Sequence, residues 1–109
     1  MINSKRKGKV GELEVVNILK DKGLTARRTQ QFSGKADGTS DVLCEELSKF
    51  HIEVKRDEHL NIEKALQQSI RDSGIENTIP TVFHRKNKEE WKVTMRLDDW
   101  LSIVGVNND

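Results

Sequence analysis

Apolar residues recur every three to four positions in two stretches of the chain, which is the spacing of an amphipathic helix. The first stretch predicts a helix over residues 4–22, and Gly23 can end it. The second stretch predicts a helix over residues 62–73, with Asn61 as its N-cap and Gly74 after its last turn. A short helix is also expected near the C-terminus, starting at Asp98 or Asp99.

Shorter segments rich in β-branched and aromatic residues predict strands. The expected strands cover residues 24–30, 41–44, 49–56, 81–86 and 91–96. A short turn joins the second strand to the third, and Pro80 introduces the fourth. Residues 31–40 are polar and contain glycine, which predicts a loop. The order of helix, three strands, helix, two strands and helix indicates one compact α/β unit.

Composition bounds the kind of protein. A chain of 109 residues favours a single domain over residues 1–109. Leu, Ile, Val and Phe number 29, above the level of disordered chains, although the core must be thin because charged residues make up 34%. We expect no membrane span and no signal peptide, and the lone Cys44 excludes an internal disulfide. The lone Cys44 also fits a reducing cytosol, so a cytoplasmic location is expected.

The net charge of +1 conceals an uneven distribution. Residues 1–35 carry nine bases and three acids, a net charge of +6, whereas the remaining residues have a net charge of −5. Such a division is typical of proteins that bind a polyanion, and it also arises by chance in solvated surfaces.

One acidic residue falls among the apolar positions of the first predicted helix. Glu12 shares a face with Gly8, Gly11, Val15 and other apolar residues, whereas Glu14 is expected to point away. A carboxylate in that position needs a cation, a donor or a metal ion beside it, unless it reaches water at the edge of the face.

Two more carboxylates and a lysine lie on the predicted hairpin. Alternation along residues 49–56 places Glu53 and Lys55 on the same side of the strand, and Asp41 begins the partner strand. Two carboxylates and a strand carbonyl form the all-oxygen ligand set that Mg²⁺ prefers. An ordinary solvated sheet face with a Glu/Lys pair is the alternative.

In order and spacing, Glu12, Asp41, Glu53 and Lys55 resemble the PD-(D/E)xK nucleases, and in particular the small Holliday-junction resolvases of archaea and phages. The resemblance extends from about residue 5 to 103 and includes Arg6-Lys7-Gly8, Gly11-Glu12, Arg27-Arg28, Ile52 to Arg56, Pro80 to Lys86, and Trp91-Lys92-Val93. The proline of the motif is replaced by Ser40, which leaves the role of the aspartate intact. The resemblance implies a restriction-endonuclease-like fold, with a central mixed sheet of about five strands flanked by helices.

The resemblance also implies roles for individual residues. Asp41, Glu53 and the backbone carbonyl of Val54 would bind Mg²⁺, with Mn²⁺ as a substitute, and Glu12 would complete the site from the helix. Lys55 would position the attacking water. Gln68 is a further candidate for the catalytic site, with Gln67 as its competitor.

Several basic residues are candidates for contacts with DNA phosphates, which dominate the affinity of DNA-binding proteins. They are Lys5, Arg6, Lys7, Lys9, Arg27, Arg28, Arg85 and Lys86, of which Arg28 best matches the arginine of the family.

The expected function is that of a Mg²⁺-dependent endonuclease that resolves four-way junctions by paired nicks leaving 5′-phosphate and 3′-hydroxyl ends. Paired nicks on opposed strands favour a homodimer. An endonuclease for other branched or duplex DNA and a non-catalytic DNA-binding domain are the alternatives. The resemblance also implies that the protein acts in a bacterial or archaeal cell, where a phage could carry its gene.

Overall fold

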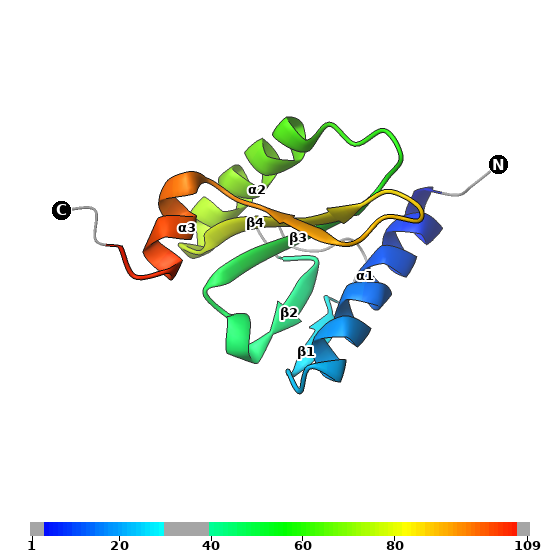
Figure 1. Ribbon diagram of the computed structural model, residues 1–109, viewed down its shortest axis with the longest axis horizontal. Helices are drawn as coiled ribbons and strands as arrows, with labels where there is room; N and C mark the ends of the chain where they lie inside the picture. Colours follow the sequence, from blue (N-terminus) through cyan, green and yellow to red (C-terminus); the bar gives the residue numbers. More distant parts are fainter. Residues whose placement is uncertain (1–3, 30–39, 107–109) are drawn as a thin grey trace.

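The computed structural model describes residues 4–29 and 40–106, apart from the side chains of residues 4–7 and 76. The described elements, shown in Figure 1, are α1 (Ser4–Asp21), β1 (Ala26–Arg28), β2 (Val42–Cys44), the 3₁₀ turn η1 (Glu45–Leu47), β3 (Phe50–Arg56), α2 (Ile62–Glu76), β4 (Ile79–Arg85), β5 (Lys92–Thr94) and α3 (Leu97–Ile103). Their order confirms the predicted α/β arrangement. Most of the predicted loop over residues 31–40 lies outside the described residues.

The five strands form one mixed sheet in the order β1-β2-β3-β4-β5. The pairs β1/β2, β2/β3 and β4/β5 are antiparallel, whereas β3 and β4 are parallel and are connected through α2. The hairpin expected from the sequence is therefore present, with η1 in its connection. Two parallel strands need such a crossover connection, because the chain must return to the end of the sheet where the first strand began before it can start the second.

Alternation along β3 divides its side chains between two layers. Ile52 and Val54 face α1 and form the core with Val15, Val16 and Val42, which are at most 6% exposed. The opposite face of β3 carries polar side chains and is covered by α2. The main apolar cluster therefore lies on the α1 side, whereas the α2 side combines buried polar residues of β3 with the apolar Ala65 and Val82.

Helix α2 ends later than the sequence predicted. Gly74 lies inside the helix, which continues to Glu76 and stops at Asn77 in the left-handed conformation, with φ 55° and ψ 47°. Asparagine tolerates this conformation better than other non-glycine residues, and its N–H closes the last turn on the Ser73 carbonyl. The prediction that Gly74 ends the helix was wrong.

Pro80 lies within β4, where the sequence had placed it ahead of the strand. The amide of Ile79 donates to the Lys49 carbonyl, so the next residue presents its nitrogen toward β5. The ladder with β5 begins only at Val82. A missing N–H is therefore tolerated at Pro80, as expected for a position without a ladder partner.

No helix in the described part of the chain is long and apolar enough to cross a membrane.

Candidate active site

Asp41 lies directly beside the peptide bond that joins Glu53 to Val54. The backbone N–H of Asp41 donates to the Ile52 carbonyl at 2.8 Å, and the Asp41 carboxylate accepts the Val54 N–H at 2.9 Å. Thr29, after β1, donates through its backbone N–H to the Asp41 carbonyl at 3.1 Å. Asp41 is 7% exposed, so the antiparallel hairpin places a buried carboxylate against the backbone of the Glu-x-Lys segment.

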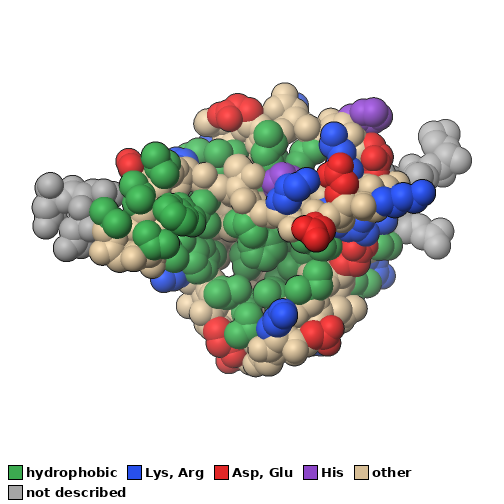
Figure 2. All heavy atoms as spheres, in the orientation of Figure 1, with side chains coloured by type: hydrophobic (Ala, Val, Ile, Leu, Met, Phe, Trp, Pro, Cys, Tyr) green, Lys and Arg blue, Asp and Glu red, His purple; other side chains and the backbone are tan. Residues whose placement is uncertain are grey.

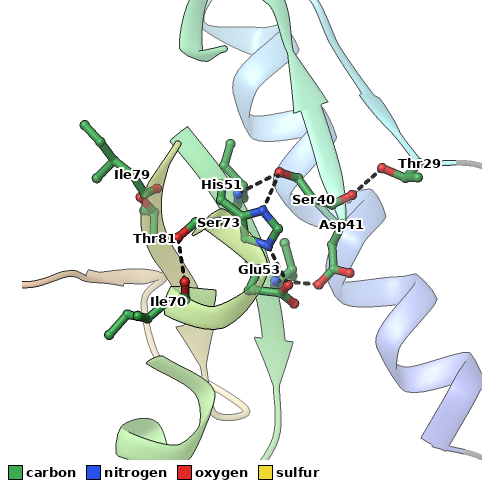
Figure 3. Close-up of polar contacts among 11 residues, drawn as sticks. Thr29, Ser40, Asp41, His51, Glu53, Ile70, Ser73, Ile79 and Thr81 are labelled. Carbon is green, nitrogen blue, oxygen red and sulfur yellow. Dashed lines mark hydrogen bonds and ion pairs between the residues drawn. The ribbon is translucent and has the colours of Figure 1, made fainter. Parts of the chain in front are cut away.

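Glu53 is 1% exposed and belongs to a buried polar chain (Figure 3). Its Oε1 atom lies 2.9 Å from Nε2 of His51, two residues earlier on the same face of β3. The other ring nitrogen of His51 lies 3.4 Å from the hydroxyl of Ser40, which also accepts the Ile52 N–H at 3.2 Å. The residue before Asp41 is thereby connected to Glu53.

Glu12 is buried, as its position among apolar residues predicted, and is compensated by a cation. Its Oε1 atom lies 3.1 Å from Nε of Arg28 at the end of β1. Glu12 is 8% exposed, and the Arg28 side chain is 28% exposed. The helical carboxylate and the arginine that best matches the family are therefore ion-paired.

Glu14 does not point away from the fold, contrary to the sequence prediction. Its two carboxylate oxygens lie 3.4 Å from Nε of Arg56 and 2.8 Å from Nη2 of Arg85. The bare helical spacing placed Glu14 off the apolar face, but long arginine side chains at the ends of β3 and β4 reach it. Glu14 therefore joins α1 to the centre of the sheet.

Lys55 and the two glutamines complete the set of predicted catalytic residues. Lys55 is half-buried on the same side of β3 as Glu53. Gln67 is exposed and donates to Glu63 at 3.2 Å, one helical turn earlier. Gln68 is half-buried and lies one turn before Asp72, on the side of α2 that covers the sheet. This placement favours Gln68 over Gln67.

Asp41 and Glu53 bring buried carboxylate oxygens to the same segment of β3, and carboxylate oxygens are the ligands that a divalent cation such as Mg²⁺ prefers, so these residues fit such a cation. Among the described residues, His51, Glu53 and Asp72 form a group whose ligand atoms all lie within 4.8 Å of one another. Glu12 and Asp41 lie outside this group. The structure thus brings the Asp41 carboxylate to the peptide bond between Glu53 and Val54, and it places His51 and Asp72 near the Glu53 carboxylate.

The sequence reasoning missed His51 and Asp72. Alternation along β3 puts His51 on the same side as Glu53 and Lys55, and this was the signal in the sequence that could have found it. Asp72 had no signal of its own, because its approach depends on how α2 docks on β3 and β4.

The predicted DNA-binding residues fall into three groups. Lys9, Arg27 and Lys86 are exposed, whereas the side chains of Lys5, Arg6 and Lys7 lie outside the described part of α1. Arg28 is bound to Glu12. Arg85 is 15% exposed, is bound to Glu14 and lies over the Trp91 ring at 5.6 Å.

The fold and this set of residues define a nuclease of the PD-(D/E)xK type, with a restriction-endonuclease-like fold. A family model described as a phage putative PDDEXK endonuclease matches residues 3–108. The chain belongs to this endonuclease family.

Other comparisons agree on the fold. The chain is similar to the 1.6 Å structure of Hjc from Archaeoglobus fulgidus, a Holliday junction resolvase from an archaeal hyperthermophile. The TM-score is 0.59 at 17% sequence identity, and the similarity covers 81% of this chain and 76% of that one. A comparison with curated proteins gave no match.

Proposed function

We propose that this chain is a divalent-cation-dependent endonuclease for branched DNA, with four-way junctions as its foremost substrate. The observation that carries the proposal is the Asp41 carboxylate, bound to the Val54 N–H beside buried Glu53, with Lys55 on the same strand face as Glu53. Similarity to an archaeal junction resolvase supports the choice of substrate.

In this proposal Asp41, Glu53 and the Val54 carbonyl hold the cation, and Glu12 contributes from α1. The cation is Mg²⁺, for which Mn²⁺ substitutes, since the donors are all oxygen. A cation bound there would lower the pKa of the attacking water and would neutralise part of the phosphate charge. Gln68 approaches the same side of the sheet from α2.

Lys55 acts on the water that attacks phosphorus. Its ammonium group orients this water and offsets the charge that develops on the phosphoryl oxygens. As the new phosphorus–oxygen bond forms, the attacking water gives up a proton to the solvent. The bond to the 3′ oxygen breaks, and this oxygen takes up a proton from the solvent. The products are a 5′-phosphate and a 3′-hydroxyl.

Phosphate contacts are assigned to the basic residues at one end of the molecule. The N-terminal part of α1 and the turn after β4 lie close together there, since a Cβ on Gly11 would be 3.7 Å from the Trp91 ring (Figure 1). The residues assigned there are Lys5, Arg6, Lys7, Lys9 and Lys86. Arg27 is assigned a separate phosphate contact on β1, and Arg28 and Arg85 contribute to the positive field from their ion-paired positions.

We also propose that the active form is a homodimer, because two opposed nicks need two sites. Helix α3 has no buried residue; Leu97 and Trp100 on it are 69% and 51% exposed, and Val104, its C-cap, is 53% exposed. Figure 2 shows hydrophobic side chains gathered at the end of the molecule where α3 lies. A second copy would cover this surface. Trp100→Glu is expected to shift sedimentation from dimer to monomer, and a monomeric wild-type protein would contradict the dimer.

The test of the catalytic site is cleavage of DNA by purified protein with and without Mg²⁺. Loss of an outer hydrogen-bond partner of a metal ligand costs about 10–100-fold in metal affinity or activity, so loss of a ligand in Asp41→Asn is expected to cost about 100-fold or more. Lys55→Ala tests the water-positioning role. Cleavage that persists in Asp41→Asn, or no cleavage by the wild-type protein, would favour a non-catalytic DNA-binding domain.

A further inference from the structure

His51 is fully buried in the sheet face that carries Glu53, and no role has yet been assigned to it. It is 0% exposed, although histidine is seldom buried without polar partners. Both of its ring nitrogens have such partners, Ser40 on one side and Glu53 on the other (Figure 3). The imidazole therefore connects the two strands that carry Asp41 and Glu53.

The hydrogen-bond partners determine where the imidazole carries its proton. An ionised carboxylate only accepts hydrogen bonds, so Nε2 of His51 must donate to Glu53 across 2.9 Å. The Ser40 hydroxyl already accepts the Ile52 N–H at 3.2 Å, and its own hydrogen can point to Nδ1 of His51 at 3.4 Å. With Nε2 as the donor to Glu53 and Nδ1 as the acceptor from Ser40, each hydrogen bond between these three side chains has one donor and one acceptor.

We propose that His51 is a positioning residue, held by Ser40, that fixes the Glu53 carboxylate in the orientation in which it binds the divalent cation. The inference rests on the proposed function, since only a cation on Glu53 gives this hydrogen bond a catalytic consequence. A carboxylate has about four acceptor sites, so a hydrogen bond from His51 is compatible with cation binding to the same group.

A fixed carboxylate binds a cation more tightly than one that must first be ordered. Glu has three rotatable side-chain bonds, and their ordering opposes binding. The Asp41 carboxylate is fixed separately, because it accepts the Val54 N–H at 2.9 Å.

Histidine could instead be a ligand itself, together with Glu53 and Asp72, whose atoms lie within 4.8 Å. The observed contact favours the positioning role of His51. Its Nε2 atom lies 2.9 Å from Oε1 of Glu53, so this nitrogen is engaged by the carboxylate. The two roles predict different responses to substitution at residue 72.

Two substitutions separate the two ring nitrogens. In His51→Gln the amide nitrogen stands as many bonds from Cβ as Nε2 does, so the donor to Glu53 is retained. In His51→Asn the amide oxygen replaces Nδ1, so the acceptor for Ser40 is retained and the donor to Glu53 is lost. Both variants remove the ring and retain a polar amide.

The measurement is the affinity for Mn²⁺ of the full chain without DNA, by titration calorimetry. His51→Gln is expected to bind within a few-fold of wild type, and His51→Asn about 10–100-fold more weakly, the usual cost of losing an outer hydrogen bond to a ligand. Asp72→Asn should retain most of the affinity. Wild-type affinity in folded His51→Asn would overturn the proposal. So would equal losses in His51→Gln, His51→Asn and Asp72→Asn, which indicate a direct ligand.

A second measurement needs no substitution of His51. The ¹⁵N shifts of the wild-type imidazole near pH 8 are expected to show the Nε2–H tautomer, and an Nδ1–H tautomer would overturn the proposal. In Ser40→Ala the expected loss of Mn²⁺ affinity is several-fold, and unchanged affinity would equally overturn it. The ¹⁵N measurement and the Ser40→Ala variant therefore test the role of His51 even where His51→Asn fails to fold.

Failure of this inference is distinguishable from failure of the proposed function. If the wild-type protein cleaves junctions and His51→Asn binds Mn²⁺ with wild-type affinity, only the proposed role of His51 is wrong. Mn²⁺ binding that follows the expected series, in a protein that cleaves no DNA, removes only the endonuclease. A wild-type protein that binds no cation removes both.

Discussion

Glu14 offers a sharp stability test, because it joins α1 to two strands at once. Its Oε1 atom accepts from Nε and Nη2 of Arg85 at 3.0 and 2.8 Å, and its Oε2 atom lies 3.4 Å from Arg56. The side chain of Glu14 is 30% exposed, and those of Arg85 and Arg56 are 15% and 22% exposed. In Glu14→Gln the shape is kept while the charge that pairs with both arginines is removed.

The expected loss lies between two limits. Exposed pairs contribute about 0–1 kcal/mol, whereas breaking a buried pair costs about 3–5 kcal/mol. Because the ion pairs of Glu14 are partly buried, we expect Glu14→Gln to lower the free energy of unfolding by about 2 kcal/mol. This loss corresponds to a decrease in Tm of roughly 10 °C for a domain of this size. The loss should shrink in high salt, because screening weakens the pairs in the wild-type protein.

Urea unfolding at low and high salt measures this loss. The matched control is Glu89→Gln, which removes the negative charge that pairs with Lys92. This pair is exposed, since the Lys92 side chain is 57% exposed and the Glu89 side chain is 45% exposed. Glu89→Gln should leave stability unchanged. If Glu14→Gln unfolds at the same urea concentration as Glu89→Gln, the argument that Glu14 joins the helix to the sheet is wrong.

Three further predictions concern packing, capping and pH. Gly11→Val places a Cβ 3.1 Å from Cβ of Arg56 and should cost about 1–3 kcal/mol. Gly8→Val, whose Cβ would meet nothing within 4 Å, should leave stability unchanged or slightly higher, because valine is a better helix former than glycine; equal losses in the two variants would refute the close approach. Asn61→Ala removes the 3.0 Å cap of α2 and should cost about 1 kcal/mol in thermal unfolding, which an unchanged Tm would contradict. Burial, and secondarily the charge of Lys92, lowers the pKa of His84 below 6.5 in the folded protein, so the unfolded chain binds the proton first as the pH falls. Stability should therefore decrease as the pH drops below about 6.5. His84→Gln should reduce this decrease, and a pH profile of stability identical to that of the wild type would refute the assignment.

The sequence predicted the parts of the site that follow from strand alternation. Glu53 and Lys55 share a face because side chains alternate along a strand, and Asp41 meets the Glu53 backbone because the hairpin is antiparallel. Helical spacing likewise placed Glu12 with the core, where it needed a cation and is bound to Arg28.

What the sequence did not predict depends on contacts between distant elements. The direction of Glu14 depends on arginines at the ends of β3 and β4, and the approach of Asp72 to His51 depends on the docking of α2. The end of α2 was misplaced because Gly74 is a stronger stop signal than Asn77, although Asn77 adopts the left-handed conformation that ends the helix.

The most direct test of the central claim compares initial cleavage rates on a four-way junction and on linear duplexes with the same arm sequences. Both substrates are offered at equal strand concentration with Mg²⁺, and the 5′ ends of the products are mapped. The account predicts paired, opposed nicks in the junction, a rate on the duplexes lower by an order of magnitude or more, and no cleavage of either by Asp41→Asn. Equal rates on junction and duplex would contradict the claim that this endonuclease selects branched DNA.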